Sequence, residues 1–235
     1  MREPLIEAEW WEYDTAAEMA EAVAGDVGFL IESALDARGD AVVAFPGGST
    51  PLKALDLLAK MKLKWKNVTI LPTDDRLVAV DDKLSNVRML AEKFLPLGAR
   101  VLPLTGGNLG VADSGKAADA RLQAIHWPLD LVWLGMGADG HTASIFPGPD
   151  LEAALAAPYR AIGVTPDPLP KEAPVARVTL TRGAILSAKS VLISISGEVK
   201  KELLEDALAD GASSKLPVGR VLADAAQAID IHWCP

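Results

Sequence analysis

One short segment combines an adaptable backbone with a side chain that can move protons. Residues 135–141 carry glycines at three positions and end on His141, with Asp139 two residues earlier. Glycine allows backbone angles that other residues rarely adopt and lets a ligand approach the main chain closely. Imidazole changes its protonation near neutral pH, so His141 can serve as a general acid or base beside an Asp139 acceptor. The segment predicts an active-site loop for proton transfer on a small anionic substrate.

The three glycines also match the Gly-x-Gly-x-x-Gly pattern of dinucleotide-binding loops. However, His141 follows the third glycine directly, and the next acidic residues, Asp150 and Glu152, come too early for the usual ribose contact. We therefore expect no nicotinamide or flavin cofactor. The three histidines lack the spacing of metal ligands, which predicts no catalytic metal, and His126 and His232 are expected to be structural.

A second loop has the composition of an anion site. Residues 46–51, Pro-Gly-Gly-Ser-Thr-Pro, follow an apolar run and precede an expected helix. Free amides and the helix dipole at such a junction favour a phosphate, and the hydroxyls of Ser49 and Thr50 add donors beside Gly47 and Gly48. Alternatively, the glycines only form a tight turn, and Ser49 or Thr50 only caps the helix, with Pro51 in its first turn.

A third group places charged side chains after the next apolar run. Asp74, Asp75 and Arg76 stand in succession, and Ser85 and Asn86 open the following helix. The guanidinium of Arg76 suits bidentate contact with an oxyanion, and Asn86 could contact a ligand. The alternative is a solvated turn with a local ion pair, and capping is the expected role of Ser85.

Apolar runs that alternate with amphipathic stretches must position these loops. A Thr15 and Glu18 capping box predicts a first helix that extends to about residue 37. Further helices are expected over residues 51–61, 85–94, 112–124 and 200–209, and strands over residues 41–45, 68–71, 131–134, 161–164, 177–180, 191–195 and 229–233. Continuous apolar strands separated by helices indicate an α/β fold with three α/β/α layers and a largely parallel, Rossmann-like central sheet. The loops at 46–50 and 135–141 then meet at the carboxyl ends of the strands.

Composition limits the possible classes of protein. With 235 residues, half of them hydrophobic, the chain can bury a sizeable core, and we expect one domain over residues 1–235. A net charge of -9 argues against nucleic-acid and anionic-membrane partners. The single cysteine, Cys234, fits a reducing compartment. Residues 1–7 lack a signal-peptide pattern and no apolar run could span a membrane, so a cytoplasmic protein is expected.

Taken together, the motifs closely resemble those of the 6-phosphogluconolactonase family, a branch of the sugar-phosphate isomerase and glucosamine-6-phosphate deaminase superfamily. The matching blocks follow the family's order and span most of the chain: residues 46–51, 74–76 with 85–86, 135–148, 177–181 and 197–200. Two departures are Asp75, where the family usually carries Glu, and residues 77–80, which lack an expected proline. Neither departure removes a group that the chemistry needs.

The resemblance implies a sugar-phosphate isomerase-like fold and hydrolysis of 6-phospho-D-glucono-1,5-lactone in the oxidative pentose phosphate pathway. Lactone opening needs a water deprotonated as it attacks, stabilisation of the carbonyl oxygen, and a proton for the ring oxygen. The catalytic residues would be His141 as the base, Asp139 as its support, and Arg76, which could serve either the carbonyl or the phosphate.

The implied partner is a small phosphorylated sugar lactone, bound without a cofactor by a monomer or small homo-oligomer. In an acidic chain, a local group of donors must hold the anion, with Arg177 and Lys200 assigned mainly to the phosphate. The expected substrate-binding residues are Gly47, Gly48, Ser49, Thr50, Asp74, Asn86, Gly137, Arg177 and Lys200.

Two other functions use the same motifs. A sugar-phosphate isomerase or deaminase would share the fold, but the deaminase needs a carboxylate shortly after the histidine, and residues 142–149 contain none. A non-catalytic sugar-phosphate sensor would need an output element such as a DNA-binding helical unit, for which this acidic chain has no spare segment.

Overall fold

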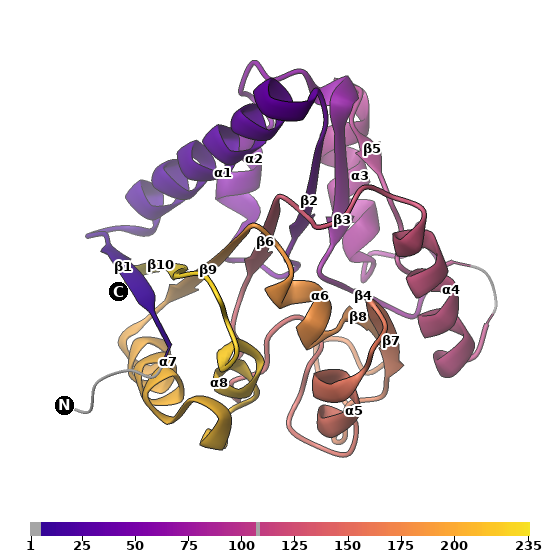
Figure 1. Cartoon of the computed structure of the whole chain (residues 1–235), viewed down its shortest axis with the longest axis vertical. Helices are drawn as coiled ribbons and strands as arrows, with labels where there is room; N and C mark the ends of the chain where they lie inside the picture. Colours follow the sequence, from indigo (N-terminus) through magenta and orange to yellow (C-terminus); the bar gives the residue numbers. More distant parts are fainter. Residues whose placement is uncertain (1–5, 107–108) are drawn as a thin grey trace.

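The computed structural model describes residues 6–106 and 109–235, so most of the opening segment used for the targeting expectation lies outside the described residues. Its centre is a seven-stranded sheet in the order β1-β10-β9-β6-β2-β3-β5, in which every neighbouring pair is parallel (Figure 1). The strands are β1 (Ala8–Glu12), β2 (Ala41–Phe45), β3 (Val68–Pro72), β5 (Arg100–Val101), β6 (Leu131–Leu134), β9 (Ser190–Ser196) and β10 (Ile229–Cys234).

Helices cover both faces of this sheet. One face carries α1 (Ala16–Arg38), α2 (Leu52–Leu58) and α3 (Asn86–Phe94). The core on the other face receives side chains from α4 (Val111–Gln123), α5 (Leu151–Ala156), α6 (Arg182–Leu186), α7 (Glu198–Asp210) and α8 (Pro217–Leu222), although α4 packs mainly against residues 161–164 and 177–180. Short 3-10 turns occupy Trp65–Asn67, Leu95–Leu97 and Gly211–Ser213. The predicted three-layer α/β/α arrangement with a largely parallel sheet is confirmed.

The apolar strands are continuous because both of their faces are buried. In β6, Leu131 and Trp133 pack into the core beneath α1 to α3, whereas Val132 and Leu134 pack into the core on the opposite side. Successive side chains of a strand point to opposite faces, so a strand with helices on both sides needs apolar residues at every position. This explains why the central strands were recognisable in the sequence.

The strands expected at residues 161–164 and 177–180 are confirmed as β7 (Ala161–Val164) and β8 (Arg177–Leu180), but they lie outside the parallel sheet. With β4 (Asp74–Arg76) they form a separate antiparallel sheet in the order β4-β8-β7. The proline-dense loop between β7 and β8 turns the chain back on itself, which pairs neighbouring strands antiparallel.

The start of α2 also differs from the expectation. Its N-cap is Pro51, which makes no side-chain capping bond, so neither Ser49 nor Thr50 caps this helix. In contrast, Thr15 caps α1 by accepting from the Glu18 amide, as predicted. The hydroxyls of Ser49 and Thr50 are therefore not used to start the helix.

The connections create a crevice near the middle of the sheet. From β2 the chain winds through β3 to β5 at one edge, and from β6 it winds through β9 to β10 in the other direction. Loops that leave the carboxyl ends of adjacent strands toward opposite faces diverge, and ligands bind in the space between them. Here those strands are β2 and β6, whose following loops contain the two glycine motifs.

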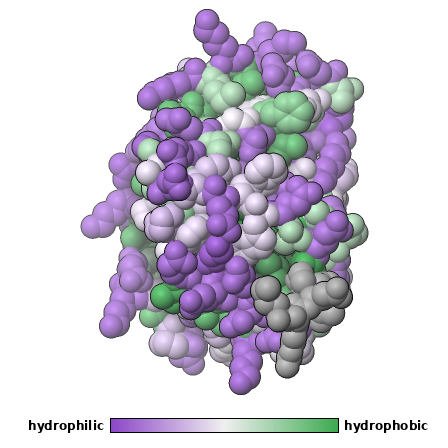
Figure 2. All heavy atoms as spheres, turned by 90° about the vertical axis from the view of Figure 1, so that its left-hand side faces the viewer, coloured by the Kyte–Doolittle hydropathy of each residue, from purple (hydrophilic) through white to green (hydrophobic). Residues whose placement is uncertain are grey.

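One face of the molecule is mostly polar. On the face seen in Figure 2, hydrophilic side chains predominate and apolar ones form separate small areas. Among the described residues, no helix has both the length and the apolar character needed to cross a bilayer.

Candidate active site

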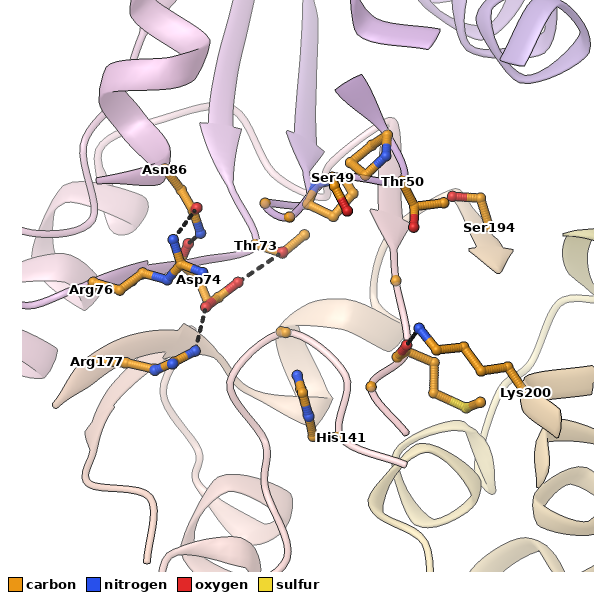
Figure 3. A pocket seen from close by; sticks show the side chains of 18 residues that line it. Ser49, Thr50, Thr73, Asp74, Arg76, Asn86, His141, Arg177, Ser194 and Lys200 are labelled. Carbon is orange, nitrogen blue, oxygen red and sulfur yellow. Dashed lines mark hydrogen bonds and ion pairs between the residues drawn. The ribbon is translucent and has the colours of Figure 1, made fainter. Parts of the chain in front are cut away.

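A cavity of about 240 Å³ opens at the carboxyl ends of β2, β3, β6 and β9 (Figure 3). Every site residue predicted from the sequence lines it, with the exception of Asp139. The predicted lining residues are Gly47, Gly48, Ser49, Thr50, Asp74, Arg76, Asn86, Gly137, His141, Arg177 and Lys200. Those not predicted are Pro46, Pro51, Thr73, Gly135, Met136, Ala143 and Ser194.

His141 is held by the carboxylate that precedes it. Its Nδ1 lies 2.5 Å from Oδ1 of Asp139, which also accepts the His141 amide at 3.1 Å. Burial alone would raise the pKa of Asp139, but the hydrogen bonds from His141 outweigh it and lower this pKa. An ionised carboxylate only accepts, so Nδ1 carries a hydrogen, and in the neutral form of the ring Nε2 holds the lone pair. No described residue bonds Nε2.

The loop around His141 depends on two glycines. The Gly137 amide donates to the His141 carbonyl at 2.9 Å, and the Gly140 amide donates to the Gly137 carbonyl at 3.0 Å. Gly140 has a φ of +75°, and a Cβ on Gly137 would lie 2.2 Å from the imidazole. The loop folds tightly enough to bring the ring over its own backbone because both positions lack a side chain.

Phe146 contacts both a base and a cation of the site. The His141 ring stacks on it with 4.1 Å between centroids and 22° between planes. The Arg177 guanidinium carbon lies 5.0 Å from the centroid of the same ring. This aromatic contact restricts the orientation of His141, whose side chain is still 29 % exposed.

Asp75 is structural, because its carboxylate is wholly buried beneath the cavity wall. Its Oδ1 accepts the amides of Arg76 at 2.9 Å and Asn86 at 2.7 Å. Its Oδ2 accepts from the hydroxyls of Ser85 and Thr105, each at 3.3 Å. Burial raises the pKa of Asp75, and the hydrogen bond from the Asn86 amide opposes this increase. Asp75 thus ties β4 to the start of α3.

Arg76 and Asn86 are arranged by the same connection. Nη1 of Arg76 donates to the Leu84 carbonyl at 2.8 Å and to Oδ1 of Asn86 at 2.9 Å. The Asn86 amide group donates in turn to the Asp74 carbonyl at 2.8 Å. A Cβ on Gly47 would lie 2.2 Å from Oδ1 of Asn86, so the loop after β2 approaches this group closely.

Arg177 stands opposite Arg76 in the small sheet, where the two residues are direct cross-strand partners. Its Nη1 lies 4.0 Å from Oδ2 of Asp74, and Ser144 donates to the same oxygen at 2.5 Å. Burial lowers the pKa of Arg177, and the nearby Asp74 opposes this effect. Guanidinium stays charged in proteins, so this wall of the cavity carries two cations.

Lys200 supplies a cation on the other side of His141 (Figure 3). It lies in the first turn of α7, and its Nζ donates to the Met136 carbonyl at 2.7 Å. Burial lowers the pKa of Lys200, which Asp139 partly offsets. The loop with Ser49 and Thr50 and the buried Ser194 also line the cavity, and Figure 3 draws Thr50 and Ser194 on the Lys200 side.

The sequence contained only a weak signal for Ser194. It is a polar residue near the carboxyl end of an apolar strand, and no motif includes it. Among the residues that the structure describes, no three His, Cys, Asp or Glu side chains are grouped so as to hold a metal ion.

Comparison with known proteins relates the chain to a family of sugar-phosphate enzymes. A family model described as glucosamine-6-phosphate isomerases/6-phosphogluconolactonase matches residues 14–233. A 6-phosphogluconolactonase of Rhizobium meliloti (strain 1021) is 37 % identical in an alignment over 230 residues that covers 95 % of this chain and 97 % of the relative. A 6-phosphogluconolactonase of Pseudomonas putida is 35 % identical over 228 residues, 94 % of this chain and 90 % of that protein.

Solved structures give the same relationship. The crystal structure of a 6-phosphogluconolactonase from Shewanella baltica OS155 superimposes with a TM-score of 0.90 at 31 % identity, covering 99 % of this chain and 100 % of the other. A monomeric glucosamine-6-phosphate deaminase reaches a TM-score of 0.80 at 20 % identity, covering 96 % of this chain and 97 % of its own, and this likeness concerns the fold alone.

Proposed function

Because the chain belongs to the glucosamine-6-phosphate isomerase/6-phosphogluconolactonase family and hydrolyses 6-phospho-D-glucono-1,5-lactone, we propose that His141 activates the water that attacks this lactone. The product is 6-phospho-D-gluconate, formed in the oxidative pentose phosphate pathway. The observation that carries the mechanism is the pairing of Asp139 with Nδ1 of His141 at 2.5 Å, because it leaves Nε2 as the base at the cavity.

In the proposed reaction, Nε2 accepts a proton from a water as the water oxygen attacks the lactone carbonyl carbon. The resulting tetrahedral intermediate carries negative charge on the former carbonyl oxygen. When the bond from this carbon to the ring oxygen breaks, the imidazolium returns its proton to that oxygen. Asp139 stabilises the positive ring between these steps, which is consistent with the low pKa of this carboxyl.

The separation of the cations suggests how the substrate lies. The sequence interpretation assigned both Arg177 and Lys200 to the phosphate, yet they stand on opposite sides of His141 in Figure 3. We place the phosphate beside Lys200 and Thr50, and the reacting carbonyl toward Arg76 and Arg177. On this assignment, the two guanidinium groups stabilise the developing oxyanion, and Asn86 fixes Arg76 through its bond to Nη1.

The phosphate end needs donors that the loop can provide. Ser49 and Thr50 do not cap α2, so their hydroxyls are available to a phosphate, together with backbone amides of Gly47 and Gly48. The net charge of the chain is -9, so only such a local group can attract an anionic substrate.

Lactone opening by the purified protein tests this function. At mildly acidic pH, where spontaneous hydrolysis is slow enough to subtract, acid release should be faster than in buffer. His141→Ala should reduce the turnover number by roughly 100-fold to 10 000-fold, because it removes a general base. The exposed His126 provides a matched control, and His126→Ala should keep the wild-type rate.

Two results would contradict the proposal in different ways. If the wild-type protein does not exceed the buffer rate, it is not a lactonase. If His141→Ala retains both the native circular dichroism spectrum and the wild-type rate, another group is the base.

A further inference from the structure

Ser194 is a polar residue buried in an apolar setting at the cavity. It lies near the carboxyl end of β9, is 3 % exposed, and lines the cavity next to Thr50 (Figure 3). Its strand neighbours Ile193 and Ile195 belong to the apolar core. A hydroxyl in such a position destabilises the fold unless its hydrogen-bonding capacity is used.

One neighbour uses only the acceptor capacity of this hydroxyl. Nε1 of Trp133, a side chain that is 1 % exposed, donates to Oγ of Ser194 at 2.9 Å. An indole has a donor and no acceptor, so Trp133 cannot receive the hydroxyl hydrogen. None of the described residues accepts that hydrogen. The remaining direction open to it is the cavity.

We propose that Ser194 donates its hydroxyl hydrogen to the substrate's phosphate and that Trp133 fixes the direction of this donation. The proposal rests on the proposed function, which places the phosphate beside Lys200 and Thr50. Ionised phosphate oxygens only accept, and therefore match a hydroxyl whose lone pair is already occupied. The two bonds run in one direction, from the indole to Ser194 and from Ser194 to phosphate, so each strengthens the other. Ser194 is thus a phosphate-binding residue, and Trp133 is a positioning residue.

The competing explanation is that Ser194 only satisfies the buried indole N–H. Two single variants, Ser194→Ala and Trp133→Phe, and their double variant distinguish the explanations. Ser194→Ala leaves the indole N–H without a partner and lowers stability, whereas the double variant removes both polar groups and should recover part of that loss. Binding should not recover, because the donor to phosphate is absent from both variants that lack the serine.

The first measurement is steady-state kinetics of the full-length protein with the lactone. Ser194→Ala and the double variant should both raise KM by about 10-fold to 100-fold, with kcat within a few-fold of wild type. Trp133→Phe should raise KM by only a few-fold, since the hydroxyl is still present but no longer oriented. A wild-type KM in the double variant would overturn the proposal, and that variant remains informative if Ser194→Ala alone does not fold.

The second measurement separates this proposal from the reaction itself. Titration calorimetry with inorganic phosphate needs no turnover, and Lys200→Ala serves as the positive control for weakened binding. Ser194→Ala and the double variant should weaken phosphate by a similar factor, whereas gluconate, which lacks phosphate, should bind equally to all variants. Undiminished phosphate binding in both serine variants would refute the role of Ser194. A protein without lactonase activity whose phosphate binding still depends on Ser194 would refute the proposed function alone.

Discussion

In the proposed mechanism, only one of the two ring nitrogens of His141 can accept a proton from water. Asp139 accepts from Nδ1, and Phe146 stacks on the ring, so the tautomer and the orientation are both set before the substrate arrives. Asp139 does not line the cavity, so in the proposed mechanism it acts only through the imidazole.

Replacing Asp139 by Asn tests this role at the scale of one atom. The amide can present its NH₂ group to Nδ1, which would place the hydrogen on Nε2 and leave the base unable to accept from water. We expect Asp139→Asn to reduce kcat by roughly 10-fold to 1000-fold while KM changes little. Steady-state kinetics of the correctly folded variant measure both values. An unchanged kcat would show that the carboxylate does not orient the base.

Residue types in ordered motifs were enough to predict most of the cavity wall. The glycine loops, the Arg76 group, Arg177 and Lys200 come from five separate segments, yet they line one cavity. Ser194 could not be predicted in the same way, because a serine in a strand carries no motif. Its exposure to the cavity depends on strand register and on the position of Trp133.

At the scale of elements, the small antiparallel sheet depends on close contact between two glycines. A Cβ on Gly115 of α4 would lie 2.2 Å from the Gly163 amide nitrogen, and a Cβ on Gly163 of β7 would lie 2.0 Å from the Val111 carbonyl oxygen. The helix therefore packs directly against the strand backbone. Because β7 pairs with β8, which contains Arg177, this contact also helps to hold Arg177 in position.

The contact predicts a large effect from a single methyl group. Gly163→Ala should lower the free energy of unfolding by about 1–3 kcal/mol, since backbone atoms must move to accommodate it. Gly25, exposed within α1 with no atom near its Cβ position, is the matched control. Gly25→Ala should leave stability unchanged or raise it by about 0.5–1 kcal/mol. Denaturant unfolding measures both, and equal midpoints would disprove the close contact.

The length of a helix or strand determined whether it could be predicted from the sequence. Long amphipathic helices and buried central strands carry a periodic pattern, and the capping residues Thr15 and Ser85 mark helix starts correctly. Strand β4 has the sequence Asp-Asp-Arg and β5 has two residues, so neither has an apolar signal. Helices α5, α6 and α8 have six residues or fewer, and tertiary packing, not their local pattern, determines them.

The stability of the whole molecule should depend on a histidine far from the chemistry. His232 on β10 is 1 % exposed, and burial lowers its pKa from 6.5 to about 4. Tyr13 bonds its Nδ1 at 2.9 Å, and Asp26 lies 3.5 Å from its Nε2, but that carboxylate is 57 % exposed and interacts weakly. Asp230 is the other carboxylate that lines a surface cavity together with His232, Tyr13 and Asp26. The folded state therefore holds the neutral ring.

This burial predicts the sign of an acid effect. Above pH 6.5 the ring is neutral in both states, so its contribution to stability is complete. As the pH falls from 6.5 to about 4, His232 binds a proton in the unfolded chain but not in the folded chain. This difference lowers the free energy of unfolding by up to roughly 3 kcal/mol. His232→Gln should show a smaller loss of unfolding free energy between pH 7.5 and pH 4.5. Equal losses in the two proteins would mean that the ring titrates normally when folded.

The placement of cations on two opposite walls also gives the cavity a polarity along its length. In the proposed orientation, the lactone enters as an anion at one tip, whereas the opened chain leaves with a second negative group, a carboxylate, facing Arg76 and Arg177. The two guanidinium groups that are proposed to stabilise the oxyanion thus also attract the carboxylate of the product. On this orientation we expect release of the product, whose phosphate and carboxylate each face cations of the cavity, to be slower than binding of the lactone.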